Sequence, residues 1–286
     1  MPDRLPPAYL KRCRTDLWFN GSVCRHGQFQ GFLVTSKNSG THWMTYMLAV
    51  ALADTYGVPR PAYFSERALR PYIRLPKDPV VHPALPALGR SHSIPHRLLD
   101  WGWARGMISP APYILGVRHP MSILASHYAK WRGELQVSWT EYLRGDPSGD
   151  RYRCDLYWIA RFWNRWGDLQ ALMPDAVLRL HYEDLRREPE KVLHAMQRHW
   201  KLDLAPEAIE AALMEGTKEA MAARIDPDGE ANVLQNRSET LETLFEGEAG
   251  EIYAGLVSRL FRHDLGYDLM RPPVSESRSS GLRAHS

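Results

Sequence analysis

Cysteine is scarce in this chain of 286 residues, and the chain also lacks long apolar runs and long runs of like charge. The three cysteines, Cys13, Cys24 and Cys154, are odd in number and widely spaced. That pattern argues against a disulfide framework and against a zinc site. A reducing cytoplasm is the simplest location for such a protein.

Stretches that would point to a membrane or to nucleic acid are missing as well. The most apolar stretch, residues 44–53, is too short to span a bilayer, and the amino-terminal residues contain no apolar core of a signal peptide. The formal net charge is only +3, and no polybasic arm occurs. We therefore expect a soluble protein with no membrane or nucleic-acid partner, and its mildly basic character suits a small anionic ligand. The oligomeric state stays open.

What the sequence does contain is an alternation of short apolar runs with amphipathic segments. This alternation predicts an α/β protein, with a three-layer fold of the P-loop type in which helices flank a central parallel β-sheet. We expect the domain to cover residues 29–270. Residues 1–28, with several prolines and polar side chains, are expected to be irregular, and residues 271–286 to form a disordered tail.

Apolar patterning places the individual elements. Continuous apolar runs of strand length are typical of buried parallel strands, and apolar positions three and four residues apart are typical of helices packed on a sheet. Strands are expected at residues 31–36, 88–91, 113–117 and 176–181, and helices at 41–56, 155–172, 189–200, 206–215 and 250–263.

The segment between the first strand and the first of these helices has the composition of an anion-binding loop. It reads Lys37-Asn38-Ser39-Gly40-Thr41. A helix amino terminus offers free N–H groups and a partial positive charge, and a glycine lets the backbone approach an anion closely. Hydroxyls of serine and threonine and a lysine charge add to this. The loop predicts a phosphate or sulfate site.

The loop does not follow the Walker A pattern, because no lysine stands between Gly40 and Thr41. A kinase-like enzyme would also need a carboxylate for Mg²⁺ near the end of a later strand. The strand at 113–117 ends instead in Arg118, which favours a second anion site. A P-loop phosphotransferase remains an alternative.

Four blocks of the sequence, in order, resemble the sulfotransferase family that uses 3′-phosphoadenosine 5′-phosphosulfate (PAPS) as donor, in its cytosolic form. VTSKNSGTHW resembles the family's 5′-phosphosulfate loop, and GRSHSIPHRLL its segment with the catalytic histidine. YILGVRHPMSILASHY resembles its 3′-phosphate segment, and LRLHYEDLRREPEKVLHAMQRHWKLDL its YEDL segment. The resemblance implies a transferase that moves a sulfuryl group from PAPS to a hydroxyl or amine of a small-molecule acceptor, without a metal.

The resemblance also implies roles for individual residues. Ser39, Gly40, Thr41 and His42 would hold the 5′-phosphosulfate, and Arg118 and Ser126 the 3′-phosphate. The adenine would contact an aromatic and hydroxyl set, namely Trp43, Tyr182 and Thr217. Arg237 stands where the family has a second arginine for the 3′-phosphate, with Arg224 as the alternative.

The catalytic base implied by the resemblance is His92, since a histidine pKa lies near neutral pH. His96 and His42 are alternatives. The family usually has a basic residue directly before its Ser-Gly-Thr, whereas here that residue is Asn38 and Lys37 comes one earlier. Either Lys37 or Asn38 would therefore stabilise the departing phosphate, and Lys37 is the catalytic candidate because its side chain is long and charged.

Nothing in the sequence identifies the acceptor. Several tryptophans in less regular segments are candidates for lining its pocket, namely Trp101, Trp103, Trp131 and Trp139. The displaced lysine leaves one more alternative, a catalytically weak nucleotide-binding protein of the same fold.

Overall fold

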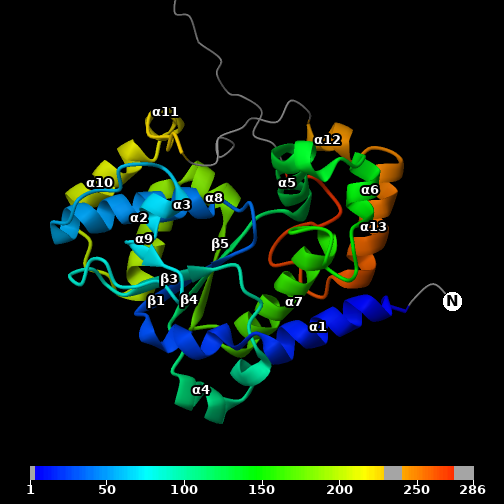
Figure 1. Cartoon of the computed structure of the whole chain (residues 1–286), viewed down its shortest axis with the longest axis horizontal. Helices are drawn as coiled ribbons and strands as arrows, with labels where there is room; N and C mark the ends of the chain where they lie inside the picture. Colours follow the sequence, from blue (N-terminus) through cyan, green and yellow to red (C-terminus); the bar gives the residue numbers. More distant parts are fainter. Residues whose placement is uncertain (1–3, 229–239, 274–286) are drawn as a thin grey trace, which may run out of the picture.

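The computed structural model describes residues 4–228 and 240–273 of the chain. Its centre is a five-stranded sheet with the strand order β2-β3-β1-β4-β5, in which every neighbouring pair is parallel. The strands are β1 (Gly31–Thr35), β2 (Ile73–Arg74), β3 (Leu88–Ser91), β4 (Tyr113–Val117) and β5 (Val177–His181). The predicted α/β fold with a central parallel sheet between helices is confirmed (Figure 1).

Strand β1 lies in the middle of the sheet, between β3 and β4. Its residue Val34 is paired with Ser91, and Thr35 is paired with Gly116. The carboxyl ends of these three strands therefore lie side by side at one edge. In open parallel sheets this is the place where ligands bind, next to the strand at which the chain changes direction.

Side chains of the buried strands alternate between two hydrophobic cores. Phe32 and Val34 belong to one core and Leu33 to the other, as the period of a strand requires. Figure 1 shows the two helical layers on opposite sides of the sheet. The Leu33 side packs against α2 (Thr41–Tyr56), α3 (Glu66–Leu69), α8 (Tyr182–Arg187), α9 (Pro189–Trp200), α10 (Pro206–Glu215) and α11 (Lys218–Ala222). The Phe32 side packs against α5 (Pro120–Leu135), α6 (Trp139–Arg144), α7 (Leu156–Leu172), α12 (Leu241–Leu244) and α13 (Glu248–Leu260).

The expected elements agree with the observed ones to within a few residues at their ends. Asp155 is the N-cap of α7, not its first residue, because its carboxylate accepts a hydrogen bond from the Trp158 N–H. Strand β2 was not expected, since two residues carry too short a pattern to identify. None of the helices in the two described ranges is long and apolar enough to cross a membrane.

The expectation of an irregular stretch over residues 1–28 is wrong. Helix α1 (Pro7–Phe19) and the 3₁₀ helix η1 (Gly21–Gln28) occupy most of it. The prolines that suggested irregular structure start α1, because Pro7 stands in its first turn, where no N–H is needed. Tertiary contacts hold the helix: the Tyr9 ring packs 5.5 Å from the Tyr157 ring, and Arg161 Nε lies 2.7 Å from Asp16 Oδ2. The expected tail lies largely outside the described residues.

Candidate functional site

A tight loop of residues 36–40 joins the buried strand β1 to α2. Two of its residues have left-handed backbone conformations, Asn38 with φ 56° and Gly40 with φ 76°. A Cβ atom at position 40 would sit 2.7 Å from Cδ2 of the Tyr182 ring. Glycine is therefore required at position 40 by the backbone turn and by the close approach of Tyr182.

The amino terminus of α2 is open to an anion. No side chain caps the first turn of this 16-residue helix, which starts at Thr41. Its first N–H groups carry the partial positive charge of the helix end. Hydroxyls border the turn: Ser39 Oγ bonds with Ser36 Oγ, and Thr41 Oγ1 lies 2.6 Å from Thr35 Oγ1. Uncapped N–H groups with hydroxyls beside them suit a phosphate or sulfate group.

His92 follows β3, and its ring is held at the end of β1. Its Nδ1 atom lies 2.8 Å from the Thr35 carbonyl oxygen and 3.1 Å from Thr35 Oγ1. Because a carbonyl oxygen can only accept, Nδ1 carries the proton and Nε2 carries the lone pair. The side chain is exposed at the surface of the site; desolvation by the neighbouring protein, with a smaller contribution from the Lys37 charge, lowers the pKa of His92 to about 4. The ring is neutral at pH 7, with Nε2 as a proton acceptor.

Thr35 links this histidine to the anion-binding end of α2, since its hydroxyl contacts both His92 Nδ1 and Thr41 Oγ1. We expect Thr35→Val to lower turnover roughly tenfold, because the ring loses one of two fixed contacts. The free energy of unfolding should fall by about 1–2 kcal/mol, as buried hydrogen bonds are lost. Steady-state kinetics and denaturant unfolding measure the two effects.

The matched control for this prediction is Thr35→Ser, which keeps the hydroxyl. It should restore turnover, although it loses a methyl group and some stability. A purely structural role for Thr35 predicts instead that turnover follows stability in both variants. Equal turnover of Thr35→Val and the parent protein would contradict the assigned role.

Lys37 and Asn38, the two candidates for stabilising a leaving phosphate, both form hydrogen bonds with other residues of the protein. Lys37 Nζ donates to the Arg153 carbonyl and lies 4.5 Å from the centre of the Trp158 ring. Burial lowers the pKa of Lys37. The Asn38 amide nitrogen lies 3.2 Å from His127 Nδ1. Lys37 is near enough for its charge to contribute to the lowered pKa of His92, which places the lysine close to the site.

Arg118, at the end of β4, is bound to the same loop. Its Nη1 donates to the Asn38 carbonyl at 2.8 Å, and its guanidinium carbon lies 4.2 Å from the centre of the Tyr182 ring. Its Nε atom is buried and has no hydrogen-bond partner among the described residues. Burial lowers the pKa of Arg118. A buried guanidinium with a free donor is suited to an anion that brings its own acceptors.

Aromatic residues stand beside these cationic groups. Trp43 Nε1 donates to the Gly216 carbonyl at 2.8 Å, and the Trp43 and Tyr182 rings meet edge to face at 6.4 Å. Thr217 follows Gly216 and caps α11, accepting from the Ala220 N–H at 3.2 Å. The structure thus brings together three residues predicted to contact adenine, next to Gly40 and Arg118.

Within the described ranges, the remaining predicted residues show no hydrogen bond or ion pair with the loop before α2 or with Arg118. Ser126 is half-buried on α5, and no contact of it with Arg118 is found. His42 Nε2 lies 3.5 Å from Glu66 Oε2, whose pKa this hydrogen bond and nearby arginines lower to about 2. Arg237 lies outside the described residues. Its alternative, Arg224, pairs with Glu215 at 2.9 Å.

The alternative base His96 binds main-chain groups of the protein through its ring. Its Nε2 lies 2.9 Å from the Trp18 carbonyl oxygen, and its Nδ1 accepts from the Leu98 N–H at 2.9 Å. Both ring nitrogens are therefore engaged by main-chain groups. The Asn20 side chain also donates to the Ile94 carbonyl, so the end of α1 fixes the segment that follows His92.

Three side chains at the site were not singled out from the sequence. Thr35 ends a buried strand. A hydroxyl at that position was the one signal in the sequence that could have identified Thr35 as a site residue. His127 directly follows Ser126, and burial lowers its pKa to about 3, which leaves Nδ1 able to accept from Asn38. Glu66 lies far from His42 in the sequence, and no pattern connects them.

The tryptophans considered for an acceptor pocket separate into three places. Trp101 and Trp103 stack on each other at 5.8 Å, and Trp103 is 65% exposed on the surface. Trp139 packs in the core and donates to the Leu244 carbonyl. The centre of the Trp131 ring lies 6.3 Å from the centre of the His127 ring. Of the four, only Trp131 stands next to a residue that contacts the loop.

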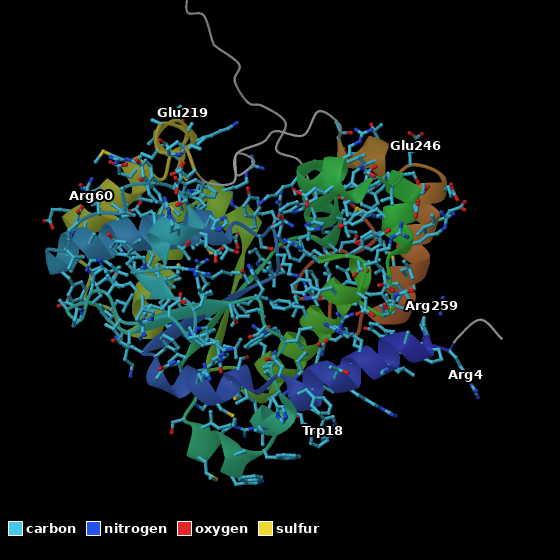
Figure 2. All side chains as sticks on the ribbon, in the orientation of Figure 1. Arg4, Trp18, Arg60, Glu219, Glu246 and Arg259 are labelled. Atoms are coloured by element: carbon cyan, nitrogen blue, oxygen red, sulfur yellow. The ribbon has the colours of Figure 1, made fainter. Side chains whose placement is uncertain are left out.

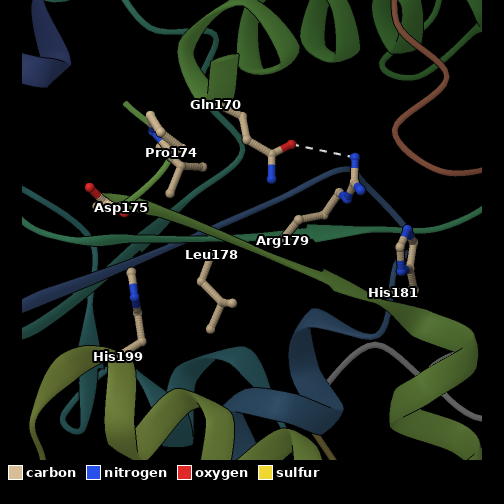
Figure 3. Close-up of a pocket in the computed structure, with 8 residues that line it drawn as sticks. Gln170, Pro174, Asp175, Leu178, Arg179, His181 and His199 are labelled. Carbon is tan, nitrogen blue, oxygen red and sulfur yellow. Dashed lines mark hydrogen bonds between the residues drawn. The ribbon is translucent and has the colours of Figure 1, made fainter. Parts of the chain in front are cut away.

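A separate depression of about 350 Å³ lies along the edge strand β5. Figure 3 shows side chains from both faces of the strand around it, with Arg179 bonded to Gln170. The lining residues are Gln170, Pro174, Asp175, Val177, Leu178, Arg179, His181 and His199. None of the predicted site residues is among them. Across residues 4–228 and 240–273, no group of three or more His, Cys, Asp or Glu side chains is arranged to hold a metal ion.

Comparisons with known proteins find similarity in part of the sequence and in the fold. The model of the Sulfotransferase family matches residues 102–206, a range that contains Arg118, Ser126 and Tyr182. The fold is similar to the crystal structure of mouse sulfotransferase SULT7A1 complexed with PAP, with a TM-score of 0.52 and 13% identity over 88% of this chain and 94% of that one. No curated protein matches the sequence significantly. At this identity the structural match concerns the fold.

Proposed function

We propose that this chain, which carries a sulfotransferase domain, transfers a sulfuryl group from PAPS to a hydroxyl or amine of a small-molecule acceptor. One observation supports this most: the uncapped amino terminus of α2 and the Arg118 guanidinium meet at one loop. Two anion sites joined in this way match a nucleotide with phosphate groups at both its 5′ and its 3′ positions.

The residues present fit such a donor. The space at position 40 is open only because glycine has no side chain there. Arg118 Nε has no hydrogen-bond partner among the described residues. The N–H groups at the start of α2 and the Ser39 and Thr41 hydroxyls would hold the 5′-phosphosulfate. Arg118 would hold the 3′-phosphate, with Ser126 as the proposed second contact. Trp43 and Tyr182 would bracket the adenine, whose face suits aromatic side chains.

His92 would act as the general base. Its Nε2 lone pair takes the proton from the acceptor hydroxyl while the acceptor oxygen forms its bond to sulfur. The bond between sulfur and the 5′-phosphate oxygen breaks, and its electron pair leaves with the nucleotide. The helix N–H groups of α2 meet the negative charge that develops there. The protein's part is to position the groups and to stabilise charge.

The leaving phosphate needs one further donor, and Lys37 is our first candidate. Its stem has rotatable bonds, so Nζ can exchange the Arg153 carbonyl for an oxygen of the donor. Asn38 is the alternative. It would have to exchange His127 for the donor, and an amide stabilises negative charge less than an ammonium does.

Selective stabilisation by 3′-phosphorylated nucleotides tests the proposal. We expect the product adenosine 3′,5′-bisphosphate to raise the thermal midpoint by several degrees at about 100 times its Kd, because a ligand that binds only the folded state stabilises it by about 2.7 kcal/mol there. ADP and ATP, with and without Mg²⁺, should raise it much less, since they lack the 3′-phosphate.

The comparison also separates the alternatives. Stabilisation by ATP with Mg²⁺ in preference to the bisphosphate would favour a phosphotransferase and contradict our proposal. Stabilisation by the bisphosphate without PAPS turnover on any of a panel of phenols, alcohols and amines would favour a nucleotide-binding protein without activity.

A further inference from the structure

Large apolar side chains gather at one end of the molecule, where the end of α1 meets the 3₁₀ helix η2 (Arg97–Asp100) and α4 (Gly102–Ile108). We call Trp18, Phe19, Trp101, Trp103 and Met107 the aromatic face. Four of them are strongly exposed: Trp18 to 48%, Phe19 to 82%, Trp103 to 65% and Met107 to 79%. Side chains of this size are rarely left in water together without a partner.

The three tryptophans of the aromatic face form an ordered cluster. The Trp101 and Trp103 rings stack nearly parallel, with an interplanar angle of 9°, and Trp18 lies 6.5 Å from Trp101. The Arg97 guanidinium carbon sits 4.6 Å from the Trp18 ring centre and 5.3 Å from that of Trp101. The cation is therefore held among the aromatic rings.

Helix α4 projects from the rest of the molecule at this end. Figure 1 shows α4 at the lower edge of the molecule, projecting beyond the sheet, and Figure 2 shows Trp18 at the same end. Trp103 and Met107 are four residues apart, so they share one side of α4. Gly102 and Gly106, also exposed, leave the surroundings of these side chains open. A projecting tip fits a flat surface better than it fits a groove.

The charge around the tip is positive. Residues 11–28 and 92–111 contain six arginines and lysines but two carboxylates. Both carboxylates are paired with arginines of α7: Asp16 with Arg161 at 2.7 Å and Asp100 with Arg165 at 2.6 Å.

The arrangement along α1 adds to this positive charge. Lys11 and Arg14 lie seven and four residues before Trp18, on the same side of the helix, and both are exposed. The aromatic face therefore has a cationic border.

We propose that the aromatic face docks on an anionic phospholipid membrane. Tryptophan and phenylalanine partition into the headgroup region of a bilayer, and basic side chains next to them are attracted by anionic lipid. A second copy of the chain fits less well, because a symmetric contact would place cation against cation. This proposal revises the expectation of no membrane partner, and it does not depend on the proposed enzymatic activity.

Co-sedimentation with vesicles tests the proposal. We expect the protein to sediment with vesicles that contain about one-third phosphatidylglycerol in phosphatidylcholine, much less with pure phosphatidylcholine, and less as salt is raised. The double substitution Phe19→Ser with Trp103→Ser should lower the partition coefficient at least about tenfold, because two interfacial anchors are lost. Lys11→Glu with Arg14→Glu should lower it by a similar factor on anionic vesicles alone.

The matched control carries serine at two exposed apolar positions outside the face, Val80 and Met214, which are 58% and 68% exposed. It should bind vesicles like the parent protein. Thermal unfolding of each variant shows whether the fold is kept. No sedimentation with anionic vesicles, or equal sedimentation of the Phe19/Trp103 variant, would overturn the proposal. So would a dimer in solution that Trp103→Ser dissociates, since the face would then be the contact between copies.

Discussion

His92→Ala is expected to reduce kcat by about 10²–10⁴-fold, the usual contribution of a general base. The expectation rests on Nε2, which is the free nitrogen because Nδ1 donates to the Thr35 carbonyl. The affinity for adenosine 3′,5′-bisphosphate should stay within about twofold, because the product lacks both the acceptor and the sulfuryl group. Acceptor-dependent turnover and calorimetric titration with the bisphosphate measure the two effects.

His194→Ala is the matched control, because this histidine lies on α9, away from the site residues, and pairs loosely with Glu190 at 3.9 Å. It should retain the activity of the parent protein. If His92→Ala keeps full turnover, His92 is not the base. If it loses bisphosphate affinity to the same degree as turnover, its role is to maintain the site and not to accept a proton.

The acid limb of the pH profile gives a second measurement on His92. Desolvation lowers the pKa of His92 to about 4, so the ring stays neutral and basic at every pH above that value. We expect kcat/KM, which reports the free enzyme, to stay level from pH 8 to about 5 and to fall only below it. A fall centred near pH 6.5, where an ordinary histidine titrates, would contradict this pKa.

Arg118→Ala is the second change with a large expected effect. It should weaken the binding of adenosine 3′,5′-bisphosphate by about 10–100-fold, since charge-assisted hydrogen bonds contribute about 1.5–3 kcal/mol. Arg118→Lys should recover part of the affinity, because it keeps the charge and loses the planar fork. Calorimetry on the three proteins measures these differences.

Adenosine 5′-monophosphate separates a direct contact from an effect on the loop. Arg118 also donates to the Asn38 carbonyl, so its removal could disturb the 5′ site as well. If the arginine binds the 3′-phosphate, the monophosphate should bind the parent protein and Arg118→Ala equally. Equal losses for both ligands would place the effect in the loop and contradict the proposed contact. Arg198→Ala, on the exposed side of α9, is the control for removing a positive charge.

Much of the sheet and its loop follows from local sequence. Strands β1 and β4 are apolar runs whose residues are all buried, and the helix after β1 begins directly after Gly40. Buried strands and helix starts depend on neighbouring residues, so a single sequence suffices to place them. The resemblance to the sulfotransferase family then implies that Gly40, His92 and Arg118 belong to one site.

What the sequence does not predict depends on contacts between distant residues. Helix α1 has no clear apolar stripe, and Tyr9 and Asp16 find their partners on α7, about 145 residues later. Likewise, no local pattern indicates that Lys37 bonds to the carbonyl of Arg153. Such contacts are set by how the layers pack, and propensity is a weak guide to them.

The anchoring of His92 through a main-chain carbonyl has a consequence for engineering. The position of the Thr35 carbonyl is set by the pairing of β1 with β3 and β4, and no substitution of a side chain can delete it. Residues that form the walls around the ring can therefore be randomised while the tautomer of the base is kept. Libraries that change which acceptors are accepted should retain a larger fraction of active members here than in an enzyme whose base is oriented by a carboxylate side chain.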